Sequence, residues 1–158
     1  FLILWYRLPG VLAVVALSAY VVLMLAFFKL IPVVLTAAGI AGFIISMGLA
    51  VDANVLIFER MKEEMRTGKN IKDAVALGIS RAWSSIRDSN IASLISATIL
   101  FWLGSSVVKG FALTLGLGVL TSLFTAIVIT RIFLLAVSGK QNGRIARFLF
   151  ANGFSKGN

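Results

Sequence analysis

One acidic side chain, Asp52, lies inside a stretch that is otherwise suited to the hydrocarbon core of a membrane. Residues 31–58 are predominantly apolar, and the charged segment that follows begins at Glu59. A carboxylate at the centre of a bilayer costs about 2.5–3.5 kcal/mol, so an acidic residue there is by default a functional-site hypothesis. On a helix that rises ~1.5 Å per residue, Asp52 lies roughly 10 Å inside the charged boundary. At this depth the short side chain needs a partner, a water-filled cavity or a proton.

The chemistry that the sequence offers at this position is proton transfer. The chain contains no histidine and no cysteine, so any proton carrier near neutral pH must be a carboxylate. Burial penalises the charged form of a carboxyl group. We therefore predict that Asp52 is a proton relay and that H⁺ is the coupling ion, with no cofactor and no metal site. The alternative is an aspartate that is paired permanently with a cation and never titrates.

The composition places the chain in the membrane. Of its 158 residues, 59% are hydrophobic and 13% are charged, whereas soluble domains average about 45–50% and about 25%. The net charge of +9 is better explained by membrane topology than by nucleic-acid binding, because Lys and Arg collect in cytoplasmic loops. No GxxxxGK[ST] motif supports ATP hydrolysis, and we expect no enzyme activity.

We predict an all-α, polytopic transmembrane helix bundle. The expected fragment has four full spans plus the end of one more. Its parts are residues 1–8, the end of a truncated transmembrane helix; 9–58, a transmembrane helix pair; 59–88, a cytoplasmic loop with an amphipathic interfacial helix; 89–137, a second transmembrane pair; and 138–158, a basic cytoplasmic tail suited to anionic lipid. The excess of Lys and Arg predicts that the loop and the C-terminus face the cytoplasm.

The segment after Asn70 has the period of an amphipathic helix. Asn70 followed by Asp73 is typical of a helix start. The apolar positions recur every three or four residues, at Ile71, Val75, Ile79, Ala82 and Ile86, with Trp83 beside them. We predict a helix that lies in the membrane interface, with a packing helix as the alternative. A turn at 87–90 should then lead the chain back into the membrane.

Small and polar residues predict how the spans pack around Asp52. At about 100° per residue, Asp52 shares one helix face with Gly48 and with other small residues, so we expect this seam to face another helix. Asn54 lies about 200° away and should bond to a different neighbour. The remaining polar positions are Asn90, beside a serine face, and Thr121 and Thr125, in a stripe with Gly110, Thr114 and Gly118. Close packing and the lining of a hydrated path both remain open for them.

Four charged residues are predicted at the membrane boundary. Glu59 and Arg60 end the apolar stretch and should act as boundary anchors. Arg87 and Asp88 are adjacent, which favours a local ion pair or a helix cap at the interface.

Three blocks of sequence resemble the SecD/SecF family of protein-export membrane proteins, a family of the proton-coupled resistance–nodulation–division (RND) superfamily. The blocks are 39–60, 82–90 and 108–126, within a resemblance that covers about residues 9–131. The Val-Asp-Ala-Asn run and the Phe58-Glu59-Arg60 ending favour the SecD side over the SecF side. The family's relay aspartate falls on Asp52. Its relay arginine belongs to SecF, and no arginine stands at the equivalent place here, near 84–85.

The resemblance also implies a function and partners. It implies an RND-type half-bundle in the inner membrane that uses the proton gradient to assist the export of unfolded secretory polypeptides. The implied partners are SecF, the SecYEG channel with SecA, YajC and YidC, and membrane lipid. Two alternatives are a proton-coupled RND exporter of small molecules or lipids, and a scaffold that tethers partners through its basic loop and tail.

Overall fold

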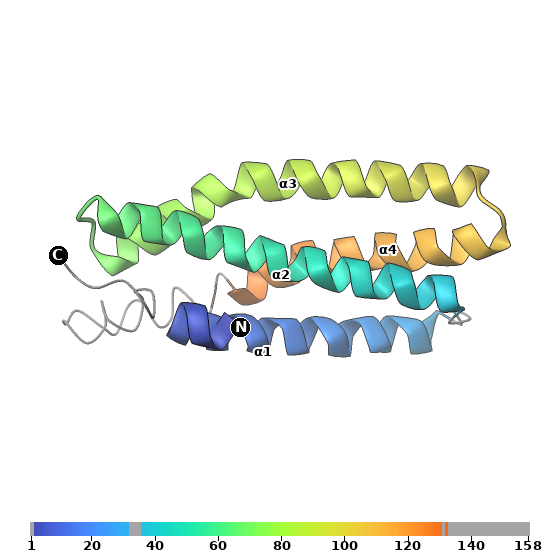
Figure 1. Cartoon of the computed structure of the whole chain (residues 1–158), viewed down its shortest axis with the longest axis horizontal. Helices are drawn as coiled ribbons and strands as arrows, with labels where there is room; N and C mark the ends of the chain where they lie inside the picture. The colour runs from blue at the N-terminus through green and yellow to red at the C-terminus, as the bar shows by residue number, and fades with distance from the viewer. Residues whose placement is uncertain (1, 32–35, 131, 133–158) are drawn as a thin grey trace.

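The computed structural model describes residues 2–31, 36–130 and 132, and these residues are helical with short connections. The elements are α1 (Leu2–Leu30), α2 (Ala37–Arg66), α3 (Ile71–Leu103), α4 (Ser106–Phe124) and the π-helix η1 (Thr125–Thr130). They run side by side along one long axis (Figure 1). This arrangement confirms the predicted all-α helix bundle.

Helix α1 contains a sharp break at Arg7. Its backbone has φ 49° and ψ −116°, a conformation that costs free energy for a residue with a side chain. The chain folds back so closely that a Cβ atom on Gly10 would lie 2.6 Å from the carbonyl carbon of Leu2. The boundary expected between residues 8 and 9 therefore falls at Arg7, and Pro9 follows in the first turn of the next helical segment, where proline is tolerated.

Tyr6, just before the break, is fastened to the charged end of α2. Its hydroxyl donates to Glu59 Oε1 at 2.7 Å, and its ring lies 5.3 Å from that of Phe58, centroid to centroid. The Lys62 ammonium lies 3.8 Å from the Tyr6 ring centroid and pairs with Glu59 at 3.2 Å. These contacts hold the first residues of α1 against α2.

Helices α2 and α3 form an antiparallel hairpin with a short connection at residues 67–70. Gly68 has φ +86°, a conformation that glycine adopts without a Cβ penalty. Asn70 caps α3 by accepting from the Asp73 N–H at 2.8 Å. The predicted helix start is thus confirmed.

The predicted turn at 87–90 is wrong, because α3 runs unbroken from Ile71 to Leu103. Residues 87–90 contain no proline or glycine, and polar side chains there bond to the helix itself. Ser89 Oγ and Asn90 Nδ2 both donate to the Ile86 carbonyl, at 3.1 and 2.7 Å. The amphipathic helix predicted in the 59–88 loop and the apolar segment that follows it are therefore one 33-residue helix.

The apolar face of the first half of α3 packs on α2, so the predicted interfacial orientation is corrected in favour of a packing helix. The contact is close, since a Cβ atom on Gly78 would lie 2.6 Å from the Met61 nitrogen. The buried residues on this face are Ile71, Ala74, Val75, Gly78, Ala82 and Ile86.

Helices α2 and α4 also approach closely in the interior. A Cβ atom on Gly42 would lie 2.6 Å from the Phe111 carbonyl oxygen, and one on Gly118 would clash with the Ser46 side chain. Small residues let helices in membranes approach in this way. The α4 stripe that includes Thr114, Gly118 and Thr121 is buried, which favours close packing over a hydrated path.

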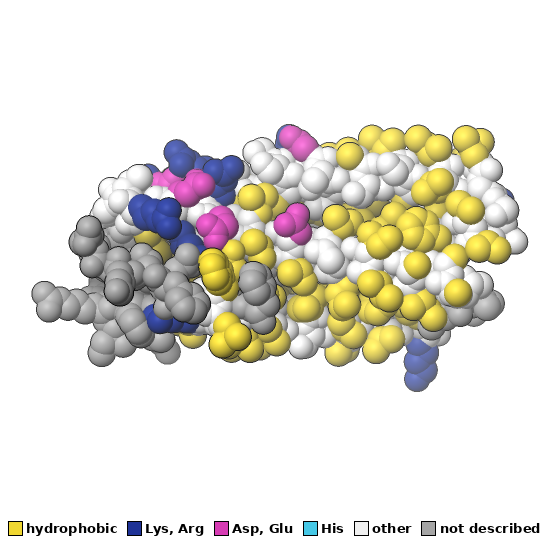
Figure 2. Space-filling view, in the orientation of Figure 1, with side chains coloured by type: hydrophobic (Ala, Val, Ile, Leu, Met, Phe, Trp, Pro, Cys, Tyr) yellow, Lys and Arg dark blue, Asp and Glu magenta, His cyan; other side chains and the backbone are white. Residues whose placement is uncertain are grey.

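Three helices of the described part are long and apolar enough to cross a membrane: Leu2–Leu30, Ala37–Arg66 and Ser106–Thr130. Helix α3 is not among them, so four full spans remain a prediction. Charged side chains gather at the end of the bundle where α2 meets α3, and hydrophobic side chains cover most of the remaining visible surface (Figure 2). The predicted tail, 138–158, lies outside the described residues.

Candidate proton site on the open face of helix α2

Asp52 is exposed on α2, and its side chain makes no hydrogen bond or ion pair with the described residues. Ala41, Ile45 and Gly48, which share its face, are exposed as well, and a Cβ atom on Gly48 would meet no atom within 4 Å. No helix among the described residues covers this seam, so its packing on another helix stays a prediction. Asp52 belongs to an open face of the bundle, which we call the Asp52 face.

The reason lies in competition between two small-residue faces of the same helix. The face that packs against α4 carries Gly39 and Gly42, together with the buried residues Ser46 and Ala50. Ser46 Oγ lies 2.7 Å from the Tyr20 hydroxyl and donates to the Phe43 carbonyl at 2.8 Å. These contacts orient α2 so that Asp52 points outward.

The two predicted asparagines are buried and connect helices without touching Asp52. Asn54 Nδ2 donates to the Ala50 carbonyl at 2.9 Å, and its Oδ1 accepts from Thr130 Oγ1 at 2.6 Å. This confirms the prediction that Asn54 and Asp52 do not share a neighbour, because Asn54 bonds to Thr130 while Asp52 is exposed. Asn90 Oδ1 accepts a longer bond from Ser122 Oγ, at 3.5 Å, which links α3 to α4.

Thr121 and Thr125 are buried on the packed side of the bundle. Their hydroxyls donate to backbone carbonyls of their own helical segment, to Leu117 at 2.8 Å and to Ser122 at 3.1 Å. Within the described residues, neither hydroxyl reaches Asp52. Their role in this structure is packing.

The Arg87–Asp88 pair lies level with Asp52 rather than with the charged boundary. Gly78 approaches Met61 where the antiparallel helices α2 and α3 touch. Asp52 lies nine residues before Met61, and Arg87 lies nine residues after Gly78, so equal helical rise places them at the same height. The predicted ion pair is present, with Arg87 Nε 3.0 Å from Asp88 Oδ1 and both side chains exposed.

At the charged end of α2, each predicted boundary residue has an acidic or basic partner. Glu59 binds Tyr6 and Lys62 as described above, and Arg60 pairs with Glu63 at 2.8 Å. Exposed pairs of this kind contribute little to stability. Their contribution is to fix the orientation of the side chains where the apolar part of α2 ends.

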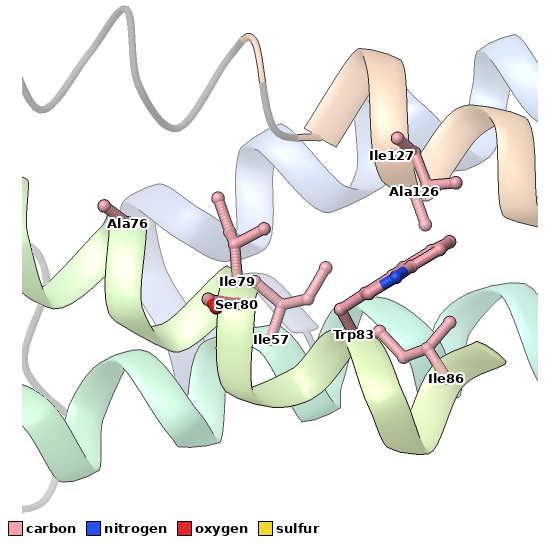
Figure 3. Close-up of a pocket in the computed structure, with 8 residues that line it drawn as sticks. All are labelled: Ile57, Ala76, Ile79, Ser80, Trp83, Ile86, Ala126 and Ile127. Carbon is pink, nitrogen blue, oxygen red and sulfur yellow. The ribbon is translucent and has the colours of Figure 1, made fainter. Parts of the chain in front are cut away.

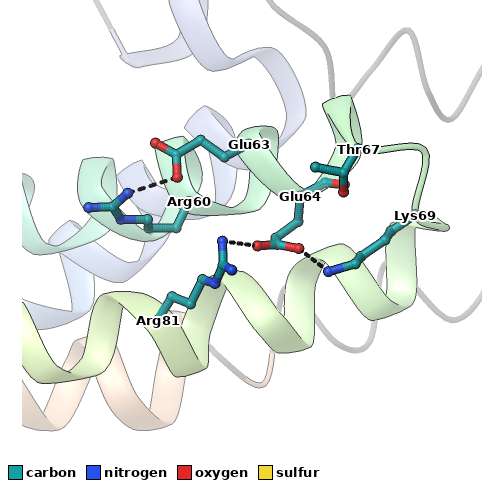
Figure 4. Close-up of polar contacts among 6 residues, drawn as sticks. All are labelled: Arg60, Glu63, Glu64, Thr67, Lys69 and Arg81. Carbon is teal, nitrogen blue, oxygen red and sulfur yellow. Dashed lines mark hydrogen bonds and ion pairs between the residues drawn. The ribbon is translucent and has the colours of Figure 1, made fainter.

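Sequence analysis missed Glu64, which has the most buried carboxylate among the described residues, with a side chain 1% exposed. It pairs with Lys69, beyond the helix end, and with Arg81 of α3 (Figure 4). In sequence, Glu64 is one of several charges in a polar run, and no spacing distinguishes it. Only the approach of α3 encloses it, which makes it the ionic connection between α2 and α3.

We expect Glu64→Gln to loosen the α2–α3 connection, because a neutral amide cannot balance the Lys69 and Arg81 charges. Limited proteolysis at residues 66–70 should be faster than in the wild type. Glu63→Gln is the matched control, since Glu63 is exposed and, among the described residues, its side chain pairs only with Arg60 on its own helix. Equal cleavage rates in the two variants would contradict this role for Glu64.

Comparison with known proteins shows which family the chain belongs to. The sequence matches the family described as "Protein export membrane protein SecD/SecF, C-terminal" over residues 2–140. The chain belongs to the SecD/SecF family. Together with its apolar helices, this membership identifies it as part of a multi-pass membrane protein.

Three relatives within the SecD/SecF family illustrate the similarity. The protein translocase subunit SecD of Thermobaculum terrenum is 58% identical over 141 residues, which cover 87% of this chain and 27% of that protein. A crystal structure of SecDF in its super-membrane-facing form has a TM-score of 0.86 at 35% identity, covering 90% of this chain and 20% of that one.

SecDF from Thermus thermophilus, described as a translocon-associated membrane protein, has a TM-score of 0.80 at 37% identity over 84% of this chain and 18% of that one. The chain therefore spans between 18% and 27% of the length of these three proteins.

Proposed function

We propose that this chain is the proton-responsive membrane part of a SecD-type subunit, in which protonation of Asp52 changes how α2 packs against a SecF-like partner. The movement assists the export of unfolded polypeptides through the SecYEG channel, after SecA has started them. The observation that carries the proposal is an exposed carboxylate on an otherwise apolar face of a membrane helix. Such a face is unfavourable in lipid when the carboxylate is charged.

The Asp52 face suits a second half-bundle. Its small side chains allow close helix approach, and the opposite side of α2 is already occupied by α4. The related solved structures carry the name SecDF, which joins SecD with SecF. We therefore infer that a SecF-like half covers Asp52 and supplies the low-dielectric surroundings in which its protonation has mechanical consequences.

The available energies are of the right size for such a switch. One charge moving through the membrane potential supplies about 2.3 kcal/mol per 100 mV, and each pH unit adds about 1.4 kcal/mol. Together they match the burial cost of about 2.5–3.5 kcal/mol for a carboxylate. Gain or loss of one proton is therefore sufficient to shift the packing of a helix whose two states are close in free energy.

The orientation and remaining partners follow the same proposal. The α2–α3 connection and the tail face the cytoplasm, and the protein resides in the inner membrane. The SecD relative named above is a translocase subunit, which favours protein export over an RND exporter of small molecules or lipids. YajC and YidC are further partners within the same assembly.

Proton flux in sealed vesicles tests the proposal directly. The whole protein, reconstituted with its SecF partner, should dissipate an imposed pH gradient during polypeptide transport, and Asp52→Asn should remove that component. Unchanged flux in the variant would refute Asp52 as the relay and would favour the scaffold interpretation.

A further inference from the structure

A groove of about 430 Å³ lies between α2, α3 and η1, and Asp52 is not among its lining residues. We call it the Trp83 groove. Figure 3 shows the Trp83 indole extending from α3 toward Ala126 and Ile127 of η1. The groove is lined by Ile57, Ala76, Ile79, Ser80, Trp83, Ile86, Ala126 and Ile127. Seven of these eight side chains present hydrocarbon or aromatic surface, so the space suits an apolar chain.

Three polar groups on the groove side of α3 have no partner among the described residues. The Ser80 hydroxyl and the Trp83 N–H make no hydrogen bond there, and Lys72 makes no ion pair. At about 100° per residue, Lys72 lies within 80° of Ser80 and of Trp83 on the helix surface. A cation, a hydroxyl and an indole N–H thus follow one another along one face, and the apolar walls begin beside them.

The order of these groups along α3 matches the passage from the headgroup region of a bilayer to its hydrocarbon core. Ile57 in the groove wall comes two residues before Glu59, where the charged end of α2 begins. Gly78 of α3 lies at the same height as Met61 of α2. Relative to this height, Lys72 lies toward the charged end of the bundle and Trp83 lies toward its apolar part. Tryptophan is enriched at this depth, where its ring is in hydrocarbon and its N–H reaches the headgroup region.

We propose that the Trp83 groove binds one anionic diacyl phospholipid. An acyl chain lies between Ile57, Ile86 and Ile127, the Trp83 N–H donates to an ester carbonyl, and Lys72 and Ser80 bind the phosphate. The choice of an anionic lipid rests on charge complementarity. Lys72 lies one helical turn before Ala76 of the lining and forms no ion pair among the described residues, and the chain carries a net charge of +9. The proposal is independent of the role of Asp52.

Fluorescence quenching of Trp83 tests this site. The chain has three tryptophans, Trp5, Trp83 and Trp102, so the W5F/W102F variant of the full chain reports on Trp83 alone. In detergent, phosphatidylglycerol brominated on its acyl chains should quench the emission at lower concentration than brominated phosphatidylcholine. Lys72→Gln should reduce this preference about five-fold, because one lysine near an anionic surface contributes about that factor.

Two further variants make a matched pair. Ala76→Phe fills the groove from an exposed position and should weaken quenching by brominated phosphatidylglycerol at least five-fold. Ser85→Phe adds similar bulk at another exposed position of α3, outside the lining, and should leave quenching unchanged. Equal quenching by both lipids, or an equal response of the two variants, would overturn the proposal. So would quenching that appears only after residues 138–158 are removed, because the tail would then be the occupant.

Discussion

Replacing Asp52 with asparagine should abolish the proton-driven part of export while the protein still inserts and folds. Asparagine has nearly the same shape as aspartate but cannot ionise, and Asp52 is exposed with no hydrogen bond or ion pair to other described residues that the change would remove. Under the proposed function, we expect the component of transport that depends on the proton gradient to fall at least ten-fold. The measurement is export of a secretory protein in cells or vesicles, at matched protein levels.

Asp88→Asn is the matched control for this experiment. It makes the same chemical change in another exposed acid at the same height in the bundle, and Asp88 already has a fixed partner in Arg87. We expect this variant to retain most of the gradient-dependent transport. Full export in Asp52→Asn at normal abundance would show that the relay lies elsewhere.

The second large effect concerns the two glycine faces of α2, on which the same substitution should have opposite consequences. Gly42→Ala places a methyl group 2.6 Å from the Phe111 carbonyl oxygen, which forces α2 and α4 apart. Overpacking of this kind costs about 1–3 kcal/mol. A lower midpoint of thermal unfolding in detergent should report it.

Gly48→Ala places the same methyl group in open space. Alanine is favoured over glycine in a helix by about 0.5–1 kcal/mol, so this variant should be neutral or slightly more stable when the chain is measured without its partner. A loss of stability as large as that of Gly42→Ala would mean that the packing face of α2 has been assigned to the wrong side.

Much of the helical architecture could be predicted because it depends on local chemistry. The apolar runs, the break near Pro9, the Asn70 cap and the change to charged residues at Glu59 are all encoded within a few neighbouring residues. The turn at 87–90 could not be recognised as helix in this way. Polar residues such as Ser89 and Asn90 favour turns in water, but here their side chains return to the Ile86 carbonyl and continue the helix.

By itself, the sequence determined that Asp52 is an acidic group in an apolar helix, and it placed small residues on the same face and Asn54 on another. Only the tertiary structure decided which of the two small-residue faces of α2 is occupied within the chain. Gly42 meets the backbone of α4 and Gly48 meets nothing, a difference that depends on where a distant helix packs. The enclosure of Glu64 by Lys69 and Arg81 has the same origin, because burial of a charge arises from contacts between helices, whereas local spacing reveals only which residues share a face.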